Sequence, residues 1–528
     1  MRGSWLSKQY DIAVVGSGFA GSVLAMIARR LGLRVVILER GKHPRFAIGE
    51  SSTPLSNLLL EELSTRYDLP KVKALTKWGS WQSTCPELPC GLKRGFSFFS
   101  HTLSRSEIGD TDRRAQLLVA ASPHDGIADT HWYRAEFDHF LVREAQNLGV
   151  DYLDEVDLRE VSDQECQMYL KGIRDGGDLE VTARFVVDAT GPRGFLHRAL
   201  KLGERRLPDF PATQGLYSHF SGVRRIQDLE QFEFEERPPY PIDDAAVHHV
   251  FDGGWAWVLR FNNGVTSAGI AAMDERAAKL KLMDGGAAWR GFLREIPLLR
   301  DQFADAEAVQ PFRHITRLGF RSGAISGRHW ALLPSAAGFV DPLLSTGFPL
   351  TLLGVARLAE MIERDWGTEQ FDTHLERYAA ETDADLVATS RLIAALYANM
   401  ANFPVFTAIS LLYFAAASFS ETARRLGKPE LASSFLLHNH PQFGPESERL
   451  LERARGVQRG RESDELIEEV FRIIEPFDVA GLGNRSRRNW YPVEAEELLS
   501  SAHKVGSSRD EIMQMLSRCG FWPATSRV

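Results

Sequence analysis

The sequence has few cysteines, and their spacing argues against both disulfides and metal. Its 528 residues contain four, Cys85, Cys90, Cys166 and Cys519, which is too few for a disulfide-stabilised scaffold. Cys85 and Cys90 flank a proline-containing loop, and no second pair is present to complete a zinc site. We therefore expect reduced thiols, a cytoplasmic protein and no metal centre.

Long hydrophobic runs are also scarce. The most apolar stretch, residues 405–419 (VFTAISLLYFAAASF), is shorter than the roughly twenty residues that a membrane span requires. It predicts a buried helix, with a membrane-contacting or substrate-covering face as the alternative. The first residues, MRGSWLSKQ, are polar and lead directly into a strand, so we expect neither a signal peptide nor an integral membrane span.

Neither sign of charge dominates, and no repeat or low-complexity tract occurs. The 62 basic and 70 acidic residues give a net charge of -8, which argues against a nucleic-acid partner because such a surface needs clustered positive charge. The hydrophobic fraction of 44% is ordinary for a globular protein. The length suggests two or three interlocked domains.

A dinucleotide-binding motif lies near the N-terminus. Residues 10–15 (YDIAVV) read as a strand, GSGFAG follows, and a helical pattern leads to a second strand, RVVILER. This order predicts a βαβ unit in which Gly16, Gly18 and Gly21 form the turn beside a bound pyrophosphate. Glu39 ends the second strand, where an acidic side chain can bond ribose hydroxyls.

Later segments predict how the rest of the chain is organised. We expect residues 1–210 to form the first part of the FAD-binding domain and residues 211–310, rich in alternating strands, to form a mainly β substrate domain. Residues 311–382 would return to the FAD-binding domain, and residues 383–528 read as a helical region. The expected class is α/β, with a Rossmann-like (GR2-type) FAD domain, an interleaved sheet and a helical C-terminal part.

FAD rather than NAD is indicated by two later motifs. VVDATGPRG, with Thr190 and Gly191, and GFVDPLLSTG, residues 338–347, recur at separations that resemble those of aromatic-hydroxylase flavoproteins. In that group the isoalloxazine lies against the turn that contains the DP pair. Arg134 resembles the group's flavin-contacting arginine, although a surface arginine at a helix start is the alternative.

Four segments resemble the flavin-dependent halogenases of the tryptophan-halogenase-like family. They are GESSTP at residues 49–54, GLKRGFSFF at 91–99, GGWAWVLRF at 253–261, and DPLLSTGFPLTLLGVARL at 341–358. The third is similar to the family signature GWxWxIP. The resemblance covers roughly residues 8–365 and implies an FAD-dependent enzyme.

The resemblance also implies a chemistry. Reduced FAD from a separate flavin reductase would react with oxygen and chloride or bromide to give hypohalous acid, which halogenates an electron-rich aromatic small molecule, free or carrier-tethered. Backbone amides of Thr346 and Gly347 would hold the halide. Lys93 would activate the oxidant, and Trp255 and Trp257 would keep the substrate from the flavin. A surface charge is the ordinary alternative for this lysine, and core packing for the tryptophans.

The residues expected to contact FAD lie in seven parts of the chain. They are Gly16, Gly18, Phe19, Ala20, Gly21, Glu39, Arg40, Glu50, Ser51, Arg134, Thr190, Gly191, Asp341, Gly347 and Phe348.

Three departures from the family pattern bear on the substrate and the cofactor. Leu259 and Arg260 replace the Ile-Pro of the signature, and Ser335 stands where an aspartate normally bonds the flavin ribityl chain. Leu344 occupies the place of the glutamate that tryptophan halogenases set beside the reacting carbon. Free tryptophan is therefore disfavoured, while phenols and pyrroles remain open.

Several other residues are expected to have no catalytic role. Lys77 has flanks that match the family less well than those of Lys93, and His248 and His249 should face opposite sides of a strand. His438 and His440 have no carboxylate nearby in the sequence. Two other functions remain open, namely a flavin monooxygenase without halide chemistry and a degenerate flavoprotein that serves as a binding subunit.

Overall fold

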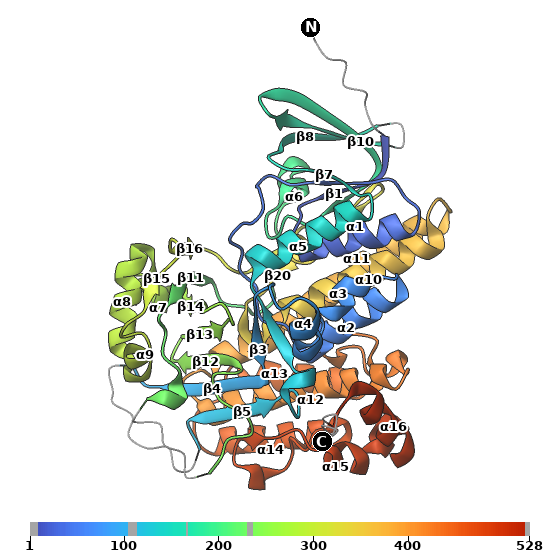
Figure 1. Cartoon of the computed structure of the whole chain (residues 1–528). Helices are drawn as coiled ribbons and strands as arrows, with labels where there is room; N and C mark the ends of the chain where they lie inside the picture. The colour runs from blue at the N-terminus through green and yellow to red at the C-terminus, as the bar shows by residue number, and fades with distance from the viewer. Residues whose placement is uncertain (1–8, 104–112, 165–166, 230–235, 523–528) are drawn as a thin grey trace.

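The computed structural model describes residues 9–103, 113–164, 167–229 and 236–522. Cys166 and most of the N-terminal segment MRGSWLSKQ lie outside the described residues. Two sheets and a group of long helices make up the molecule (Figure 1), with the FAD-domain sheet in the upper part and the second sheet at the lower left. The predicted α/β class is confirmed.

The first sheet is mainly parallel. Its central order is β19-β10-β1-β2-β7, to which β18 and the β8–β9 hairpin add antiparallel strands. The bounds are β1 Gln9–Val15, β2 Val35–Leu38, β7 Asp151–Leu153, β8 Asp157–Gln164, β9 Gln167–Arg174, β10 Gly177–Asp188, β18 Ser326–Gly327 and β19 Trp330–Leu332. Because β10 pairs with β19, which comes much later in the chain, this sheet is assembled from distant segments.

Three helices form the main cover of this sheet. They are α1 (Phe19–Arg30), α5 (Arg134–Asn147) and α10 (Gly347–Asp365), and α1 packs against both of the others. Strands β1 and β2 are almost entirely buried apolar residues, which is the pattern of parallel strands covered on both faces. Phe19 at the start of α1 and Phe348 at the start of α10 stack with ring centroids 5.1 Å apart, so the amino ends of the two helices lie together.

The second sheet draws strands from three separate regions of the chain. Its order is β15-β11-β14-β13-β12-β4-β5-β21, and β16 also pairs with β11. The bounds are β4 Gly95–His101, β5 Gln116–Ala120, β11 Thr213–Ser221, β12 Ala246–Phe251, β13 Gly254–Arg260, β14 Thr266–Met273, β15 Glu307–Ala308, β16 Arg313–Ile315 and β21 Trp490–Tyr491. Residues 211–310 supply the middle of the sheet, while β4, β5 and β21 come from the expected FAD-binding and helical segments.

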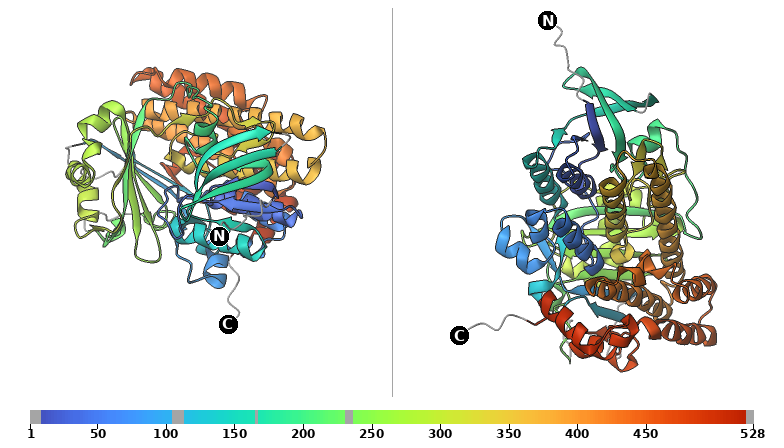
Figure 2. Two further views of the ribbon diagram at one scale, coloured as in Figure 1. Left: turned by 90° about the horizontal axis from the view of Figure 1, so that it is seen from above. Right: turned by 90° about the vertical axis from the view of Figure 1, so that its right-hand side faces the viewer.

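The second sheet is covered on both faces. One face packs on α8 (Gly286–Glu295) and α9 (Pro297–Gln302) through buried aromatic and aliphatic side chains. The other face lies toward the FAD domain and the C-terminal helices, and Figure 2 shows the sheet edge-on between these two layers.

The C-terminal region is helical, as predicted. Its helices are α11 Gln370–Ala398, α12 Phe403–Arg425, α13 Phe443–Ala454, α14 Arg461–Ile474, α15 Ala495–Ser500 and α16 Arg509–Cys519. Helix α12 contains the apolar run and has the length and composition to cross a membrane, but 83% of its most apolar window is buried inside the protein. The predicted buried helix is confirmed.

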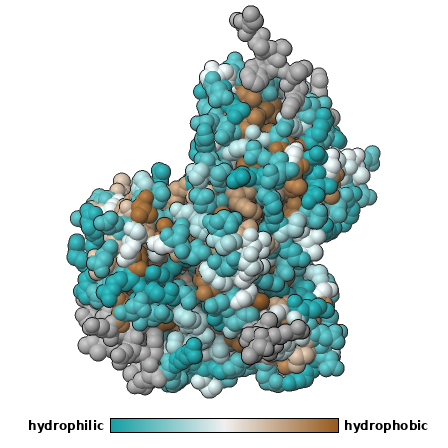
Figure 3. All heavy atoms as spheres, viewed as in Figure 1, coloured by the Kyte–Doolittle hydropathy of each residue, from teal (hydrophilic) through white to brown (hydrophobic). Residues whose placement is uncertain are grey.

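Shorter helices and two small two-stranded sheets, β3–β6 and β17–β20, complete the fold. They are α2 Pro54–Arg66, α3 Pro70–Ala74, α4 Trp78–Thr84, α6 Phe195–Ala199, α7 Asp274–Lys279, β3 Cys90–Lys93, β6 Asp129–Trp132, β17 Phe320–Arg321 and β20 Gly338–Phe339. The surface in Figure 3 is mostly hydrophilic, with hydrophobic side chains in small separate groups.

The strand β21 should anchor the C-terminal region to the second sheet. Trp490 is buried, its indole N–H donates to Gln116 Oε1 at 3.1 Å, and the Arg113 guanidinium lies 3.6 Å from its ring centroid. We expect Trp490→Ala to lower the free energy of unfolding by about 3–5 kcal/mol. Urea unfolding would measure this change. Trp522→Ala is the matched control because Trp522 is 44% exposed, and an equal loss in both variants would contradict the anchoring role.

Candidate active site

Two adjacent cavities follow the edge of the first sheet where α1 and α10 begin. One has a volume of about 410 Å³ and is lined by Gly16, Glu39, Arg40 and Thr190. The other has a volume of about 400 Å³ and reaches between the FAD domain and the second sheet. Pro192 lines both, so the two cavities are neighbours, an arrangement that suits an extended dinucleotide.

The glycine turn leaves room for a pyrophosphate. Gly16 has φ +100°, and a Cβ there would lie 2.8 Å from the Ala189 backbone. A Cβ at Gly21 would lie 2.2 Å from the Gly16 carbonyl oxygen, so this glycine lets α1 pack directly on the turn. Gly18 stands just before the helix, whose first amides lack acceptors within it. Ala20, in contrast, is buried within α1.

Glu39 is held as a carboxylate where the sequence predicts a ribose-binding acid. Its oxygens accept hydrogen bonds from Ser17 N at 2.9 Å, Ser17 Oγ at 2.7 Å and Gly41 N at 2.8 Å. Burial alone would raise its pKa, but the Arg45 guanidinium and these hydrogen bonds outweigh burial and lower it. Glu39 is thus an ionised acceptor on the wall of the first cavity.

The second cavity has the size and lining expected for an isoalloxazine ring. Of the predicted flavin contacts, Phe19, Glu50, Ser51, Arg134, Gly347 and Phe348 line it. Arg134 donates to Asp138 and to the carbonyl oxygens of Ile48 and Gly49, so its guanidinium position is fixed. We call this space the flavin cavity.

Glu50 carries a buried acceptor that no described residue satisfies. Its Oε1 lies 2.7 Å from His219 Nε2, but Oε2 has no hydrogen-bond partner within the described ranges. A buried acceptor without a partner is costly unless a ligand supplies a donor, and the isoalloxazine ring carries an N–H group. The residues present therefore fit FAD.

Trp255 and Trp257 both lie on the flavin cavity wall. Their ring centroids are 5.6 Å apart, and both side chains are buried. The Trp255 indole N–H donates to Asp341 Oδ1 and Tyr397 OH, each at 3.2 Å. Asp341 also accepts from Tyr397 OH at 2.9 Å, so this carboxylate holds the tryptophan and the turn and does not line the cavity.

The predicted halide site lies at the start of α10. Gly347 is the first residue of the helix and Thr346 its buried N-cap. The first amides of a helix have no acceptor within it, and its dipole favours an anion there. Gly347 lines the flavin cavity, so this helix end lies beside the space that fits the flavin, and the halide site stays a prediction.

Lys93 is fully buried between the flavin cavity and a third cavity. Its Nζ donates to Ser51 Oγ at 2.9 Å and to the Ser52 carbonyl oxygen at 2.5 Å, and lies 3.8 Å from the Phe96 ring centroid. Ser51 lines the flavin cavity, while Phe96 lines the third cavity. Burial lowers the pKa of Lys93 to about 7, although the Asp129 carboxylate opposes the shift.

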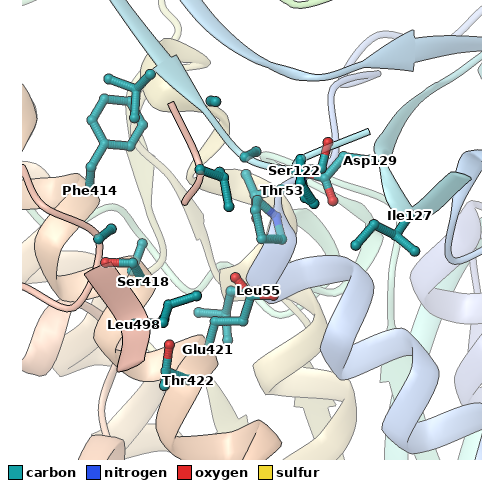
Figure 4. Close-up of a pocket in the computed structure, with 18 of the residues that line it drawn as sticks. Thr53, Leu55, Ser122, Ile127, Asp129, Phe414, Ser418, Glu421, Thr422 and Leu498 are labelled. Carbon is teal, nitrogen blue, oxygen red and sulfur yellow. The ribbon is translucent and has the colours of Figure 1, made fainter. Parts of the chain in front are cut away.

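The third cavity lies between the second sheet and the C-terminal helices and has a volume of about 180 Å³. Its wall combines β4, β5 and α12 with residues that follow β21, and includes Tyr413, Phe414, Leu498 and Phe521. In Figure 4, Thr53, Ser122 and Asp129 lie at one end of this space and Phe414 at the other. We call it the ring cavity.

Asp129 was not found by sequence reasoning. It is the first residue of β6 and pairs in register with Lys93 of β3, so the two side chains lie on the same face of this strand pair. Its neighbours in the sequence match no motif, and only the strand pairing brings it to the lysine.

The departures from the family pattern have limited effects on the cavities. Leu259 lines the flavin cavity, but Arg260 bonds the carbonyl oxygens of Val223 and Arg224 at 2.9 and 3.1 Å. Ser335 lines the flavin cavity, where its hydroxyl remains the predicted weaker partner for the flavin. The buried Leu344 lines neither cavity among the described residues, and its carbonyl accepts from Tyr413 OH at 3.0 Å.

The residues expected to be inactive have ordinary partners. Lys77 reaches the ring cavity but pairs with Glu61 at 3.2 Å. His248 lines the flavin cavity, whereas His249 bonds His101 on the other face.

His438 lies 3.0 Å from Asp385, a carboxylate that is distant in the sequence and comes from α11. Within the described ranges, no group of three His, Cys, Asp or Glu side chains is arranged to hold a metal ion.

Fold and site together define an FAD-binding oxidoreductase with a second sheet laid against the flavin cavity. A profile of the tryptophan halogenase family matches residues 120–402, more than half of the chain, and an NAD(P)-binding Rossmann-like profile matches residues 14–55. The chain belongs to the tryptophan halogenase family and is a flavin-dependent enzyme with FAD as its cofactor.

Named relatives show the range of this similarity. Tetracycline 7-halogenase from Kitasatospora aureofaciens is 28% identical over 425 residues, which cover 78% of this chain and 73% of the relative. A Pseudomonas fluorescens chlorinase of pyrrole-2-carbonyl groups on a peptidyl-carrier protein is 25% identical, covering 70% of this chain and 79% of the relative. The structure of halogenase PltM with phloroglucinol and FAD has a TM-score of 0.77 at 22% identity, covering 91% and 99% of the two chains.

The close contact at Gly21 predicts a loss of FAD binding. In Gly21→Ala the new methyl group would push the Gly16 turn away from α1, and we expect FAD affinity to fall by about ten-fold or more. Flavin fluorescence titration measures this affinity. Gly456→Ala is the control because its Cβ would meet no atom within 4 Å, and unchanged affinity in Gly21→Ala would exclude FAD from this turn.

Proposed function

We propose that this protein halogenates an electron-rich aromatic small molecule with hypohalous acid formed beside the flavin. The observation that carries the proposal is the burial of Lys93 between the flavin cavity and the ring cavity. A buried ammonium is costly, and its two acceptors, Ser51 Oγ and the Ser52 carbonyl, hold it at the boundary. Such a group can hydrogen-bond an oxidant arriving from one side and present it to a ring on the other.

Each part of the site has a role in this reaction. Reduced FAD, which we propose a separate reductase supplies, provides with oxygen the two-electron oxidation of chloride or bromide. The amides of Thr346 and Gly347 hold the halide, and Trp255 and Trp257 fill the space through which a substrate would reach the flavin. Lys93 donates a hydrogen bond to the hypohalous acid and polarises it.

The ring cavity limits the size of the reacting group. Its volume of about 180 Å³ is close to the roughly 150 Å³ of an apolar cavity that takes up benzene. We infer that one aromatic ring enters it. The named relatives act on tetracycline or on a carrier-bound pyrrole, which supports an aromatic or heteroaromatic substrate, free or carrier-tethered.

Halide chemistry can be tested without the substrate. The protein is mixed with reduced FAD, oxygen and bromide or chloride, and hypohalous acid is trapped with an activated diketone and detected by mass. A halogenated trap that requires halide supports the proposal. Hydrogen peroxide release without trap product under either halide would favour a monooxygenase.

Lys93 should separate oxidant formation from halogenation of the substrate. We expect Lys93→Met to lower turnover of an aromatic substrate by about a hundred-fold or more while trap halogenation continues, because only delivery of the oxidant is lost. The exposed Lys73→Met is the control. Equal turnover by Lys93→Met and wild type would remove Lys93 from the mechanism.

A further inference from the structure

The polar end of the ring cavity has hydrogen-bonding capacity that the protein leaves unused. Asp129 Oδ1 accepts from Asn57 Nδ2 at 2.8 Å, but Oδ2 has no hydrogen-bond partner among the described residues. Ser122 Oγ is also buried without a partner in the same part of the structure. Both residues line the ring cavity, and Figure 4 shows them at the same end of it.

Two such groups are expensive to bury unless a ligand satisfies them. An unsatisfied buried donor or acceptor costs about 1–3 kcal/mol, and a charged one costs more. The rest of the cavity is largely apolar, since Leu55, Val119, Phe414 and Leu498 contribute to its wall. The expected occupant therefore has an apolar ring and one polar group at its end.

The pair of free groups distinguishes between possible ring substituents. Carboxylate oxygen only accepts hydrogen bonds, whereas a serine hydroxyl can donate one. A phenolic hydroxyl donates one bond and accepts another, so it satisfies both Asp129 and Ser122. A pyrrole N–H has no acceptor to offer the serine.

Asp129 is also placed to act on the reacting ring. It pairs in register with Lys93 across antiparallel strands β3 and β6, so the Cβ atoms are expected about 4.5–5.5 Å apart. The Lys93 ammonium and the Asp129 carboxylate therefore lie near one another at the polar end of the ring cavity.

We propose, resting on the halogenase function above, that the substrate is a phenol and that Asp129 is a catalytic residue that binds its hydroxyl and takes up its proton. Removing that proton raises the electron density of the ring as it attacks the halogen. Ser122 donates a hydrogen bond to the same oxygen. The base that the family places at position 344 is thus supplied from β6.

The proposed step conserves atoms and charge. The C–halogen bond forms as the halogen–oxygen bond of hypohalous acid breaks, and the departing hydroxide takes a proton from the Lys93 ammonium and leaves as water. The phenol proton passes to Asp129, which gives a neutral halogenated dienone. Its ring proton then moves to the oxygen, and Asp129 returns its proton to Lys93.

The electrostatic surroundings of Asp129 are compatible with this role. Burial raises its pKa to about 7, while the charge of Lys93 and the Asn57 hydrogen bond oppose the rise. From α12, Glu421 raises the pKa further and Arg425 lowers it. Because the Asp129 carboxylate accepts a proton only when ionised, turnover of a phenol should fall as the pH drops below about 7.

Three substituted benzenes distinguish a contact with the phenolic hydroxyl from a general effect of a substitution on activity. They are resorcinol, 3-methoxyphenol and 1,3-dimethoxybenzene, which lose one O–H group at each step. The FAD-loaded enzyme should show kcat/KM values that fall in this order. In Asp129→Asn, which keeps the shape and the Asn57 contact, we expect resorcinol to lose about a hundred-fold and dimethoxybenzene to change by about three-fold at most.

Matched variants test the assignment further. Ser122→Ala should lower the preference for resorcinol only several-fold, because a hydrogen bond between neutral groups contributes less free energy than one to a carboxylate. Asp125→Asn is the control, since Asp125 lies near in the chain but is exposed and pairs with Arg94 at 2.7 Å. The fall of activity at low pH should be absent in Asp129→Asn with resorcinol. A preference for the hydroxyl that survives in Asp129→Asn overturns the proposal.

The trap assay and calorimetry show which proposal fails, the halogenase function or the phenol substrate. The Asp125→Asn control should form halogenated trap at the wild-type rate, and flavin fluorescence titration of Asp129→Asn shows whether its FAD binding is intact. If wild type makes trap product but neither binds nor halogenates resorcinol, the phenol proposal fails and the halogenase proposal stands. If no trap forms, the halogenase proposal fails, and calorimetric binding of resorcinol by wild type and Asp129→Asn still decides whether Asp129 binds the hydroxyl.

Discussion

The burial of one ammonium group, that of Lys93, is the constraint around which the rest of the site is arranged. A full charge placed away from water must be compensated locally. Ser51 and the Ser52 carbonyl, from the loop before α2, and the face of Phe96, from β4 of the second sheet, give that compensation. The contact of this loop and β3 with the second sheet therefore fixes the position of the Lys93 ammonium, with Ser51 on the wall of the flavin cavity and Phe96 on that of the ring cavity.

The same contact explains why the chain combines a Rossmann-like sheet with a second, mainly antiparallel one. The first sheet sets the amino ends of α1 and α10 beside an extended cavity, which suits a dinucleotide and an anion. The second sheet presents Trp255 and Trp257 to that cavity and, through β4, part of the ring cavity wall. Asp341 joins the two because it holds both the turn before α10 and the Trp255 indole.

The C-terminal helices determine what can enter the site. Helix α12 packs on β4 through Phe406 and Phe414, which contact the rings of Phe98 and Phe96. Its apolar composition is thereby explained by burial and not by lipid. Together with the residues after β21 it lines a space about as large as one aromatic ring, so the proposed substrate would be selected by a region that carries no recognisable motif.

The sequence by itself determined the nucleotide fold, the flavin and the family, because these depend on local patterns. A glycine turn between a strand and a helix, an acid at the next strand end and alternating tryptophans each fix backbone or side-chain direction over a few residues. Only the tertiary structure decided what lies beside Lys93. Asp129 and Ser122 are distant from it in the chain, and strand pairing and burial, which depend on long-range packing, bring them to one cavity and leave their polar atoms without partners.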